Sequence, residues 1–196
     1  GYAWMAVYAT GLRETLRWAE RLEADGALGE LERLILQAGF GEYINQLGSG
    51  IAISQGEIVR PADLGLDPAD IAPLRENAAA VLAAQGNTNA VRMRIAALIE
   101  HGDYGNCGYG DETLEMIADQ FHRFADEKVI PDAHDWHRQD TLIPMDVIEQ
   151  MSEMGVFGLT VPEEYGGHGM GKVAMCVVTE ELSRGYIGVG SLGTRS

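Results

Sequence analysis

Basic residues are scarce in this sequence. Its 196 residues include 14 lysines and arginines against 30 aspartates and glutamates, which gives a formal net charge of −16 at pH 7. Such a surface repels phosphate backbones and no basic patch interrupts it, so we expect no nucleic-acid partner. A docking surface for a basic partner and adaptation to high salt are alternative readings, but charge informs solubility more than function.

Long apolar runs are also missing. No uncharged apolar stretch approaches the roughly 20 residues that a membrane-crossing helix needs, so we expect no membrane insertion. Residues 1–10 carry no basic leader and no small-residue cleavage site, so we expect no signal peptide. The two cysteines, Cys107 and Cys176, lack the spacing of a metal site or a disulfide framework and indicate a reducing compartment. These absences predict the cytoplasm of a bacterium, or the mitochondrial matrix in a eukaryote.

Helical periodicity is the main positive signal. Hydrophobic residues make up 46% of the chain, and they recur every three or four positions between polar neighbours. The pattern predicts a second helix interrupted at Gly39 and Gly41, a short extended piece within 51–59, and one helix from the Asp67 cap to Gly86. Helices joined by short loops, with almost no strand, predict an all-α chain.

A glycine-rich stretch divides the chain. Four glycines fall within residues 102–110, and fixed glycines lose more backbone entropy than other residues, so this stretch is a predicted boundary. We therefore expect two helical units. The first spans residues 1–102, a glycine-rich linker spans 103–110, and the second unit spans 111–196.

The second unit contains several helix boundary signals. Asp111 is placed to cap a helix that ends at Ile130, because the residue before Pro131 is pushed out of the helical region. Pro144 begins the next helix, at a position where its missing N–H has little effect. Residues 156–161 are predicted to be extended.

One group of polar residues has side chains that could bind a metal ion. Zinc or iron would bind side chains such as those of Asp132, His134, Asp135 and His137. Their spacing falls in a predicted polar loop and no second motif completes a ligand shell, so we expect no metal. His122 lies one helix earlier.

Adjacent glutamates and glycine-rich loops also give no catalytic set. The pair Glu163 and Glu164 and the pair Glu180 and Glu181 could supply acid–base catalysis, but neighbours on a helix point in different directions. We expect Glu180 to face inward and Glu181 to face solvent. The glycines of residues 166–171 lack the lysine followed by serine or threonine of a phosphate loop. From the residues alone, the sequence predicts no catalytic or cofactor-binding residue.

A resemblance to the acyl-CoA dehydrogenase family is carried by residues 143–184, which read IPMDVIEQMSEMGVFGLTVPEEYGGHGMGKVAMCVVTEELSR. The consecutive features are a helix starting at Pro144, MGVFGL at 154–159, VPEEYGG at 161–167 and a helix ending in EELSR. The resemblance extends over residues 111–196 and is to the amino-terminal helical domain of that family.

This resemblance implies an FAD-dependent oxidoreductase acting on CH–CH groups. In the family, a β domain and a second helical domain follow, and FAD lies between them. A glutamate of the last domain removes the α-proton of an acyl-CoA thioester, a hydride leaves the β-carbon for the flavin, and electron-transferring flavoprotein reoxidises the flavin. Members are homodimers or homotetramers. The resemblance places the base and the flavin contacts outside residues 1–196, which we expect to be inactive alone.

Within the chain, the resemblance implies that the segment after EELSR forms part of the wall around the acyl group. The substrate-binding candidates are Tyr186, Ile187, Val189, Gly190 and Leu192. Ordinary packing is an equally good interpretation of these residues, because pocket walls and cores are both mostly apolar.

The first hundred residues have no counterpart in ordinary family members. Through LQAGFGEY at 36–43 and SQGEIVR at 54–60, they resemble the extra domain of the methylsuccinyl-CoA dehydrogenase subfamily. This implies oxidation of (2S)-methylsuccinyl-CoA to mesaconyl-CoA in the ethylmalonyl-CoA pathway. The substrate's free carboxylate would need a partner, for which Arg184 and Tyr186 are the nearest candidates. The alternatives are another short- or branched-chain acyl-CoA dehydrogenase and, from a different class, a flavin-free helical interaction module.

Overall fold

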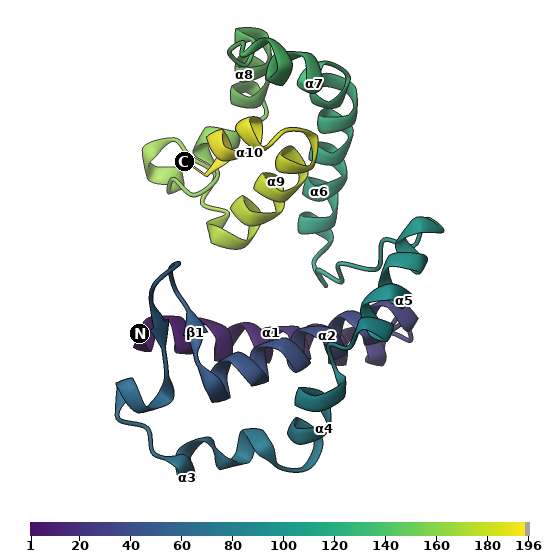
Figure 1. The fold of residues 1–196 in the computed structure, drawn as a ribbon. Helices are drawn as coiled ribbons and strands as arrows, with labels where there is room; N and C mark the ends of the chain where they lie inside the picture. The colour runs from purple at the N-terminus through teal and green to yellow at the C-terminus, as the bar shows by residue number, and fades with distance from the viewer. Residues whose placement is uncertain (195–196) are drawn as a thin grey trace. The chain divides into compact units, whose positions relative to one another are not determined.

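The computed structural model describes residues 1–194 and divides into two compact units. Unit 1 is Gly1–Gly108 and unit 2 is Tyr109–Ser196. Helices dominate both units in the described part of the chain, where the one sheet has two short strands (Figure 1). The prediction of an all-α chain is confirmed. Among the described helices, none is long and apolar enough to cross a membrane.

Unit 1 is built around two long antiparallel helices (Figure 1). Its elements are α1 (Tyr2–Ala24), α2 (Glu30–Ser49), β1 (Ile51–Ala52), β2 (Ile58–Val59), the 3-10 turn η1 (Pro61–Leu64), α3 (Pro68–Ile71), the 3-10 turn η2 (Ala72–Arg75), α4 (Asn77–Gln85) and α5 (Asn89–Glu100). The helix α2 contacts α1, α4 and α5 and is therefore the centre of the unit. The two strands pair antiparallel, with Ile51 opposite Val59, and both of these side chains are buried.

The predicted interruption of α2 at Gly39 and Gly41 is wrong, because α2 runs without a break. Gly41 instead lies against the end of α4. A Cβ at Gly41 would lie 2.7 Å from the backbone nitrogen of Asn87 and 2.8 Å from the Cα of Gly86. Asn45, one turn later, donates to the carbonyls of Gly41 and Ala83 at 2.8 and 2.6 Å. The glycine allows two helix backbones to approach rather than ending a helix.

The predicted helix from Asp67 to Gly86 is also divided. Asp67 is the N-cap as expected, and its carboxylate accepts from the amides of Ala69 and Asp70. Pro73 then lies within η2, where it cannot donate an amide and crowds the carbonyl four residues earlier. Helical structure begins again with α4 at Asn77, which has a φ of 50°. The apolar period therefore continued in the sequence across two breaks, the end of α3 before Pro73 and the extended backbone of Glu76.

The last residues of unit 1, which follow α5, are held by side chains of α1 and α2. Glu32, which is only 5% exposed, accepts the backbone amide of Asn106 at 2.7 Å. The indole of Trp18 donates to the carbonyl of Asn106 at 3.1 Å, and Arg21 donates to the carbonyl of Gly108 at 3.2 Å. Three side chains of α1 and α2 thus hold this glycine-rich segment, and the division between the units lies between Gly108 and Tyr109.

Unit 2 contains five α-helices in its described residues. Its elements are α6 (Glu112–Phe124), the π-helical turn η3 (Ala125–Val129), α7 (Ile130–Gln139), α8 (Met145–Glu153), the 3-10 turns η4 (Val156–Gly158) and η5 (Glu163–Tyr165), α9 (Gly171–Gly185) and α10 (Ile187–Gly193). Its core forms where α6, α7, α8 and α9 meet, and α10 covers the end of α9 (Figure 1). The fully buried side chains of this core include Val129, Met151, Val156, Val178, Leu182 and Val189.

The helix α6 begins where the sequence predicts. One carboxylate oxygen of Asp111 accepts from the amides of Thr113 and Leu114 at 2.8 and 3.3 Å. Replacing Asp111 with alanine leaves these amides unpaired and is expected to lower the free energy of unfolding of unit 2 by about 1 kcal/mol. Asp111→Asn, which keeps the cap oxygen, should lose much less. Denaturant titration of the three proteins checks this, and equal losses for both variants would contradict it.

The predicted helix end at Ile130 is wrong, because the chain stays helical from α6 through α7. The turn between them is a π-helix, Ala125–Val129, and Pro131 lies in the first turn of α7. The wider π turn removes the clash that a proline ring makes with the carbonyl four residues earlier in a regular helix. His134 and His137 consequently lie on a helix rather than in a loop, and both are exposed.

The segment that follows α8 is not extended. Gly155 has a φ of 83° and turns the chain, after which Val156 and Leu159 are buried with the core. A three-residue spacing of buried side chains suits the 3-10 turn η4, whereas an extended segment would bury alternate residues. Pro144 is the N-cap of α8, so the helix begins at Met145, one residue after the predicted start.

Candidate functional site at the α9–α10 corner

A sharp corner joins α9 to α10. Tyr186 is the one residue between the two helices, and its extended backbone has a φ of −158°. Its carbonyl accepts the amides of Val189 and Gly190 at 2.9 and 3.1 Å, which starts α10. Its own amide donates to the carbonyl of Leu182 at 3.0 Å. The backbone thus fixes the corner from both sides.

The helix α10 packs on α9 through a glycine. A Cβ at Gly190 would overlap the Ser183 hydroxyl and lie 2.8 Å from both the backbone nitrogen and the Cα of Ser183. No side chain fits there unless α10 moves away from α9. Val189, beside it, is fully buried in the core of unit 2.

The predicted substrate-binding residues lie on different faces of this one segment. Tyr186 is half-buried and packs edge to face with Trp136, with ring centroids 6.2 Å apart. Val189 and Gly190 are buried, and Leu192 is partly buried against the core. Ile187, by contrast, is 71% exposed. Substrate contact by these residues stays a prediction, and Ile187 is the one whose side chain is mostly free to make it.

The exposed side of α10 and its C-cap residue Thr194 also carry two hydroxyls that the sequence argument did not select. Ser191 and Thr194 follow Ile187 at helical spacing, and both are exposed. Ser191 donates to the carbonyl of Gly188 at 2.9 Å, and Thr194 donates to the carbonyl of Ser191 at 2.8 Å. The helical period counted from Ile187 is the signal that would have found them.

A polar cluster links the last turn of α9 to α6 and η3. Arg184 contacts Asp126 at 2.8 Å and Glu181 at 3.2 Å, and donates to the carbonyl of His122 at 3.1 Å. His122 lies 2.9 Å from Glu181 and 3.4 Å from Asp126. Burial would lower the pKa of the Arg184 guanidinium, but its hydrogen bonds to Asp126 and Glu181 outweigh this effect and raise that pKa. Arg184 is therefore a firmly charged group with its carboxylate partners already in place.

The predicted orientation of the adjacent glutamates is reversed. Glu180 is exposed, whereas the side chain of Glu181 is only 16% exposed and lies in the polar cluster. Glu163 and Glu164 are exposed in η5. The helix α9 is rotated by about one residue from the orientation that we expected, so Glu181 makes the contact with α6. Neither pair brings two carboxylates to one substrate.

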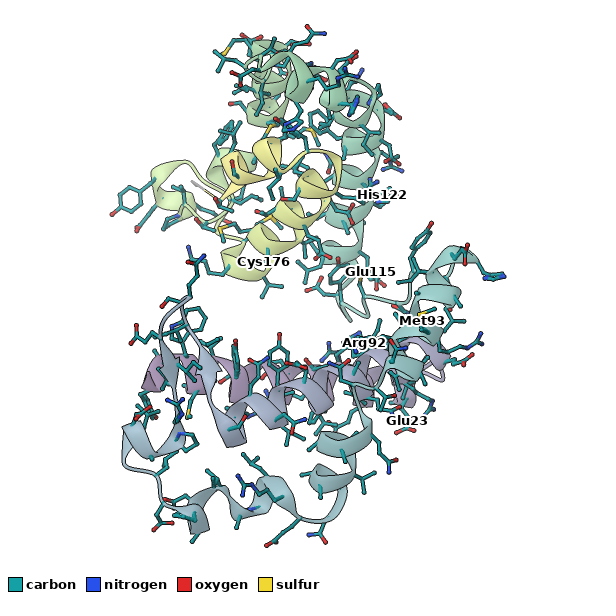
Figure 2. The ribbon with its side chains drawn as sticks, in the orientation of Figure 1. Glu23, Arg92, Met93, Glu115, His122 and Cys176 are labelled. Atoms are coloured by element: carbon teal, nitrogen blue, oxygen red, sulfur yellow. The ribbon has the colours of Figure 1, made fainter. Side chains whose placement is uncertain are left out.

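The glycine-rich loop before α9 has no free run of backbone amides that could bind the diphosphate of FAD. The consecutive amides of residues 166–170 all donate to carbonyls of residues 158–163, at 2.9–3.2 Å. A phosphate-binding loop presents such amides to the ligand instead. Among the described residues, no group of three or more histidine, cysteine or acidic side chains could hold a metal ion. Both cysteines are exposed free thiols, and Figure 2 shows Cys176 on α9.

The structural elements of unit 2 coincide with a known domain. Residues 111–195 match the family model described as the acyl-CoA dehydrogenase N-terminal domain. They belong to the acyl-CoA dehydrogenase family. This confirms the resemblance drawn from the helix at Pro144, the VPEEYGG loop and the EELSR end of α9. In this domain, the α9–α10 corner directly follows the EELSR residues.

Similarity to one relative extends through unit 1. The chain is 53% identical over 200 residues to (2S)-methylsuccinyl-CoA dehydrogenase of Cereibacter sphaeroides, covering 99% of this chain and 35% of that relative. It is 38% identical over 74 residues to glutaryl-CoA dehydrogenase of Desulfococcus multivorans, covering 37% and 19% of the two chains. It is also 38% identical over 89 residues to mitochondrial isovaleryl-CoA dehydrogenase of Oryza sativa subsp. japonica, covering 44% and 22%. The chain thus spans about a third of the first relative and about a fifth of the other two.

Proposed function

We propose that the protein to which this chain belongs is an FAD-dependent acyl-CoA dehydrogenase that oxidises (2S)-methylsuccinyl-CoA to mesaconyl-CoA. The observation that carries this proposal is the 53% identity along 99% of the chain with a relative of that name. The other two relatives align over only 74 and 89 residues. The extra unit 1 is therefore shared with the methylsuccinyl-CoA enzyme over its whole length.

The proposed reaction removes one hydrogen from the α-carbon and one from the β-carbon of the thioester. FAD would supply the two-electron acceptor, and we expect its contacts and the catalytic base in parts of the protein beyond unit 2. Glu180 and Glu181 do not suit the role of base, because Glu181 already has partners in the polar cluster and Glu180 is exposed. The contribution of this chain would be the α9–α10 corner, as part of the wall around the acyl group.

The wider setting is proposed on the same resemblance. We infer that electron-transferring flavoprotein accepts the electrons and that the enzyme is a homodimer or homotetramer. A role in the ethylmalonyl-CoA pathway follows from the proposed substrate and product. A location in the bacterial cytoplasm, or in the mitochondrial matrix of a eukaryote, accords with the two free thiols.

A substrate comparison tests the proposal. The full-length protein is assayed with (2S)-methylsuccinyl-CoA, glutaryl-CoA and isovaleryl-CoA, with an artificial electron acceptor. We expect kcat/KM for methylsuccinyl-CoA to exceed the others by roughly tenfold or more, because a pocket built for a polar group discriminates strongly against substrates that lack or misplace it. A preference for glutaryl-CoA or isovaleryl-CoA would reassign the substrate. Absence of any acyl-CoA oxidation and of flavin would favour a helical interaction module.

A further inference from the structure

The last turn of α9 is held from two sides by the same π-helical turn. On the outside, Arg184 reaches Asp126 of η3 at 2.8 Å. On the inside, Gly185 lies against two fully buried residues of η3, where a Cβ would come within 3.0 Å of Val129 and 3.3 Å of Ala125. Turns with π geometry inside α-helices are frequent at functional sites. Here the wide turn presents a carboxylate and an apolar contact to consecutive residues of α9.

The polar cluster around this turn is a closed ring. Each of the two carboxylates, Asp126 and Glu181, contacts both Arg184 and His122. Figure 2 shows His122 on α6, and Glu181 reaches it from α9 at 2.9 Å. Arg184 also donates to the His122 carbonyl, so its guanidinium bonds to three different residues at once. A planar guanidinium can do this, whereas a lysine ammonium would reach fewer of these partners.

The position of α10 depends on this turn of α9. Tyr186 and Gly185 separate Arg184 from α10, and Gly190 returns to lie on the backbone of Ser183. A displacement of the last turn of α9 would therefore carry α10 with it. Ile187 and the exposed hydroxyls on its face would move away from their present places.

We propose that Arg184 is a positioning residue, which fixes the α9–α10 corner against the π-helical turn and so sets the acyl-binding wall. This inference rests on the proposed function for its consequence in catalysis. It also distinguishes two roles for Arg184, which are holding the α9–α10 corner and pairing with the free carboxylate of the substrate. An arginine that already bonds Asp126 and Glu181 is not available as the partner of a substrate carboxylate without breaking the ring.

The test compares Arg184→Gln with wild type in the full-length protein, using two acyl-CoA substrates. One is methylsuccinyl-CoA, and the other is its analogue in which a methyl group replaces the free carboxylate. Loss of a positioning residue is expected to raise KM by roughly tenfold for both substrates, because small displacements of a binding wall weaken all acyl contacts. Arg184→Lys should restore part of the loss. Flavin content should stay at the wild-type level.

A matched control and a structural readout complete the experiment. Arg123→Gln removes an arginine from α6 whose 2.8 Å pair with Asp119 is exposed on both sides, and it should change neither KM. Asp126→Asn removes one of the three contacts that Arg184→Gln removes, so the double variant should be no worse than Arg184→Gln alone. Hydrogen exchange of residues 186–194 should become faster in Arg184→Gln, while that of α8 stays the same.

The outcomes separate the two proposals. A rise in KM for methylsuccinyl-CoA alone would make Arg184 a substrate ligand and overturn the inference. Unchanged KM for both substrates, with unchanged exchange of residues 186–194, would also overturn it. If the wild-type protein oxidises no acyl-CoA, the proposed function fails, and the exchange of α10 by itself decides whether Arg184 positions the corner.

Discussion

Replacing Leu182 with alanine is expected to lower the free energy of unfolding of unit 2 by about 3 kcal/mol. Leu182 has no exposed surface and lies in the core cluster where α9 meets α6, α8 and α10. Alanine removes the buried side-chain carbons and leaves a cavity that helices on several sides cannot all close. Hydrogen exchange of the core amides of α9, measured as a function of denaturant, reports this change for unit 2 separately.

The same substitution at Leu142 is the matched control, because that side chain is 91% exposed. Leu142→Ala should change the stability by less than about 0.5 kcal/mol. The amides of α2 in unit 1 should exchange as in the wild type in both variants. A loss of under about 1 kcal/mol for Leu182→Ala would mean that α9 is not packed in the core as described.

Gly41→Ala is expected to destabilise unit 1 by about 2–3 kcal/mol. The new Cβ would lie 2.7–2.8 Å from backbone atoms of Leu82, Gly86 and Asn87, and backbone atoms cannot rotate away as a flexible side chain can. The helices α2 and α4 would have to separate. Denaturant unfolding, followed by hydrogen exchange of the α2 amides, measures the loss.

Gly39→Ala is the control in the same helix, and we expect it to raise the stability of unit 1 where Gly41→Ala lowers it. A Cβ at Gly39 meets no atom within 4 Å, and alanine stabilises a helix interior over glycine by about 0.5–1 kcal/mol. The two glycines were indistinguishable in the sequence, where both indicated an interruption. Similar effects of the two substitutions, of either sign, would contradict the close crossing of α2 and α4.

The local boundary signals were the part of the fold that the sequence predicted well. Asp67 and Asp111 cap their helices, because a carboxylate one residue ahead of a helix start satisfies free amides whatever the tertiary context. The short extended piece pairs Ile51 with Val59. These outcomes depend on a few adjacent residues and so are readable from one sequence.

The misjudged positions depend on partners distant in sequence or on an unusual turn. Gly41 is a contact residue because Gly86 lies opposite it, which a pattern within one helix cannot reveal. The rule that ends a helix before Pro131 failed because a π turn makes room for the ring. Glu181 rather than Glu180 meets α6, since a shift of one residue rotates a helix by about 100°.

The candidate site was found by family resemblance and not by its chemistry. The residues of the α9–α10 corner are apolar or small, and they resemble core positions in any helical protein. The sequence placed the corner after Arg184 but could not assign the phase of α10, which buries Val189 and exposes Ile187. The polar cluster was likewise unpredictable, because His122 and Glu181 are 59 positions apart.

The most direct test of the account is the absorption spectrum of the full-length protein, recorded without oxygen before and after (2S)-methylsuccinyl-CoA is added. We expect flavin bands in the purified protein and their loss on addition of the substrate, because the substrate's two electrons reduce the flavin. Glutaryl-CoA and isovaleryl-CoA should bleach the bands much more slowly. A full-length protein without flavin bands, or with bands that none of the three thioesters reduces, would contradict the proposal that unit 2 is part of an acyl-CoA-oxidising enzyme.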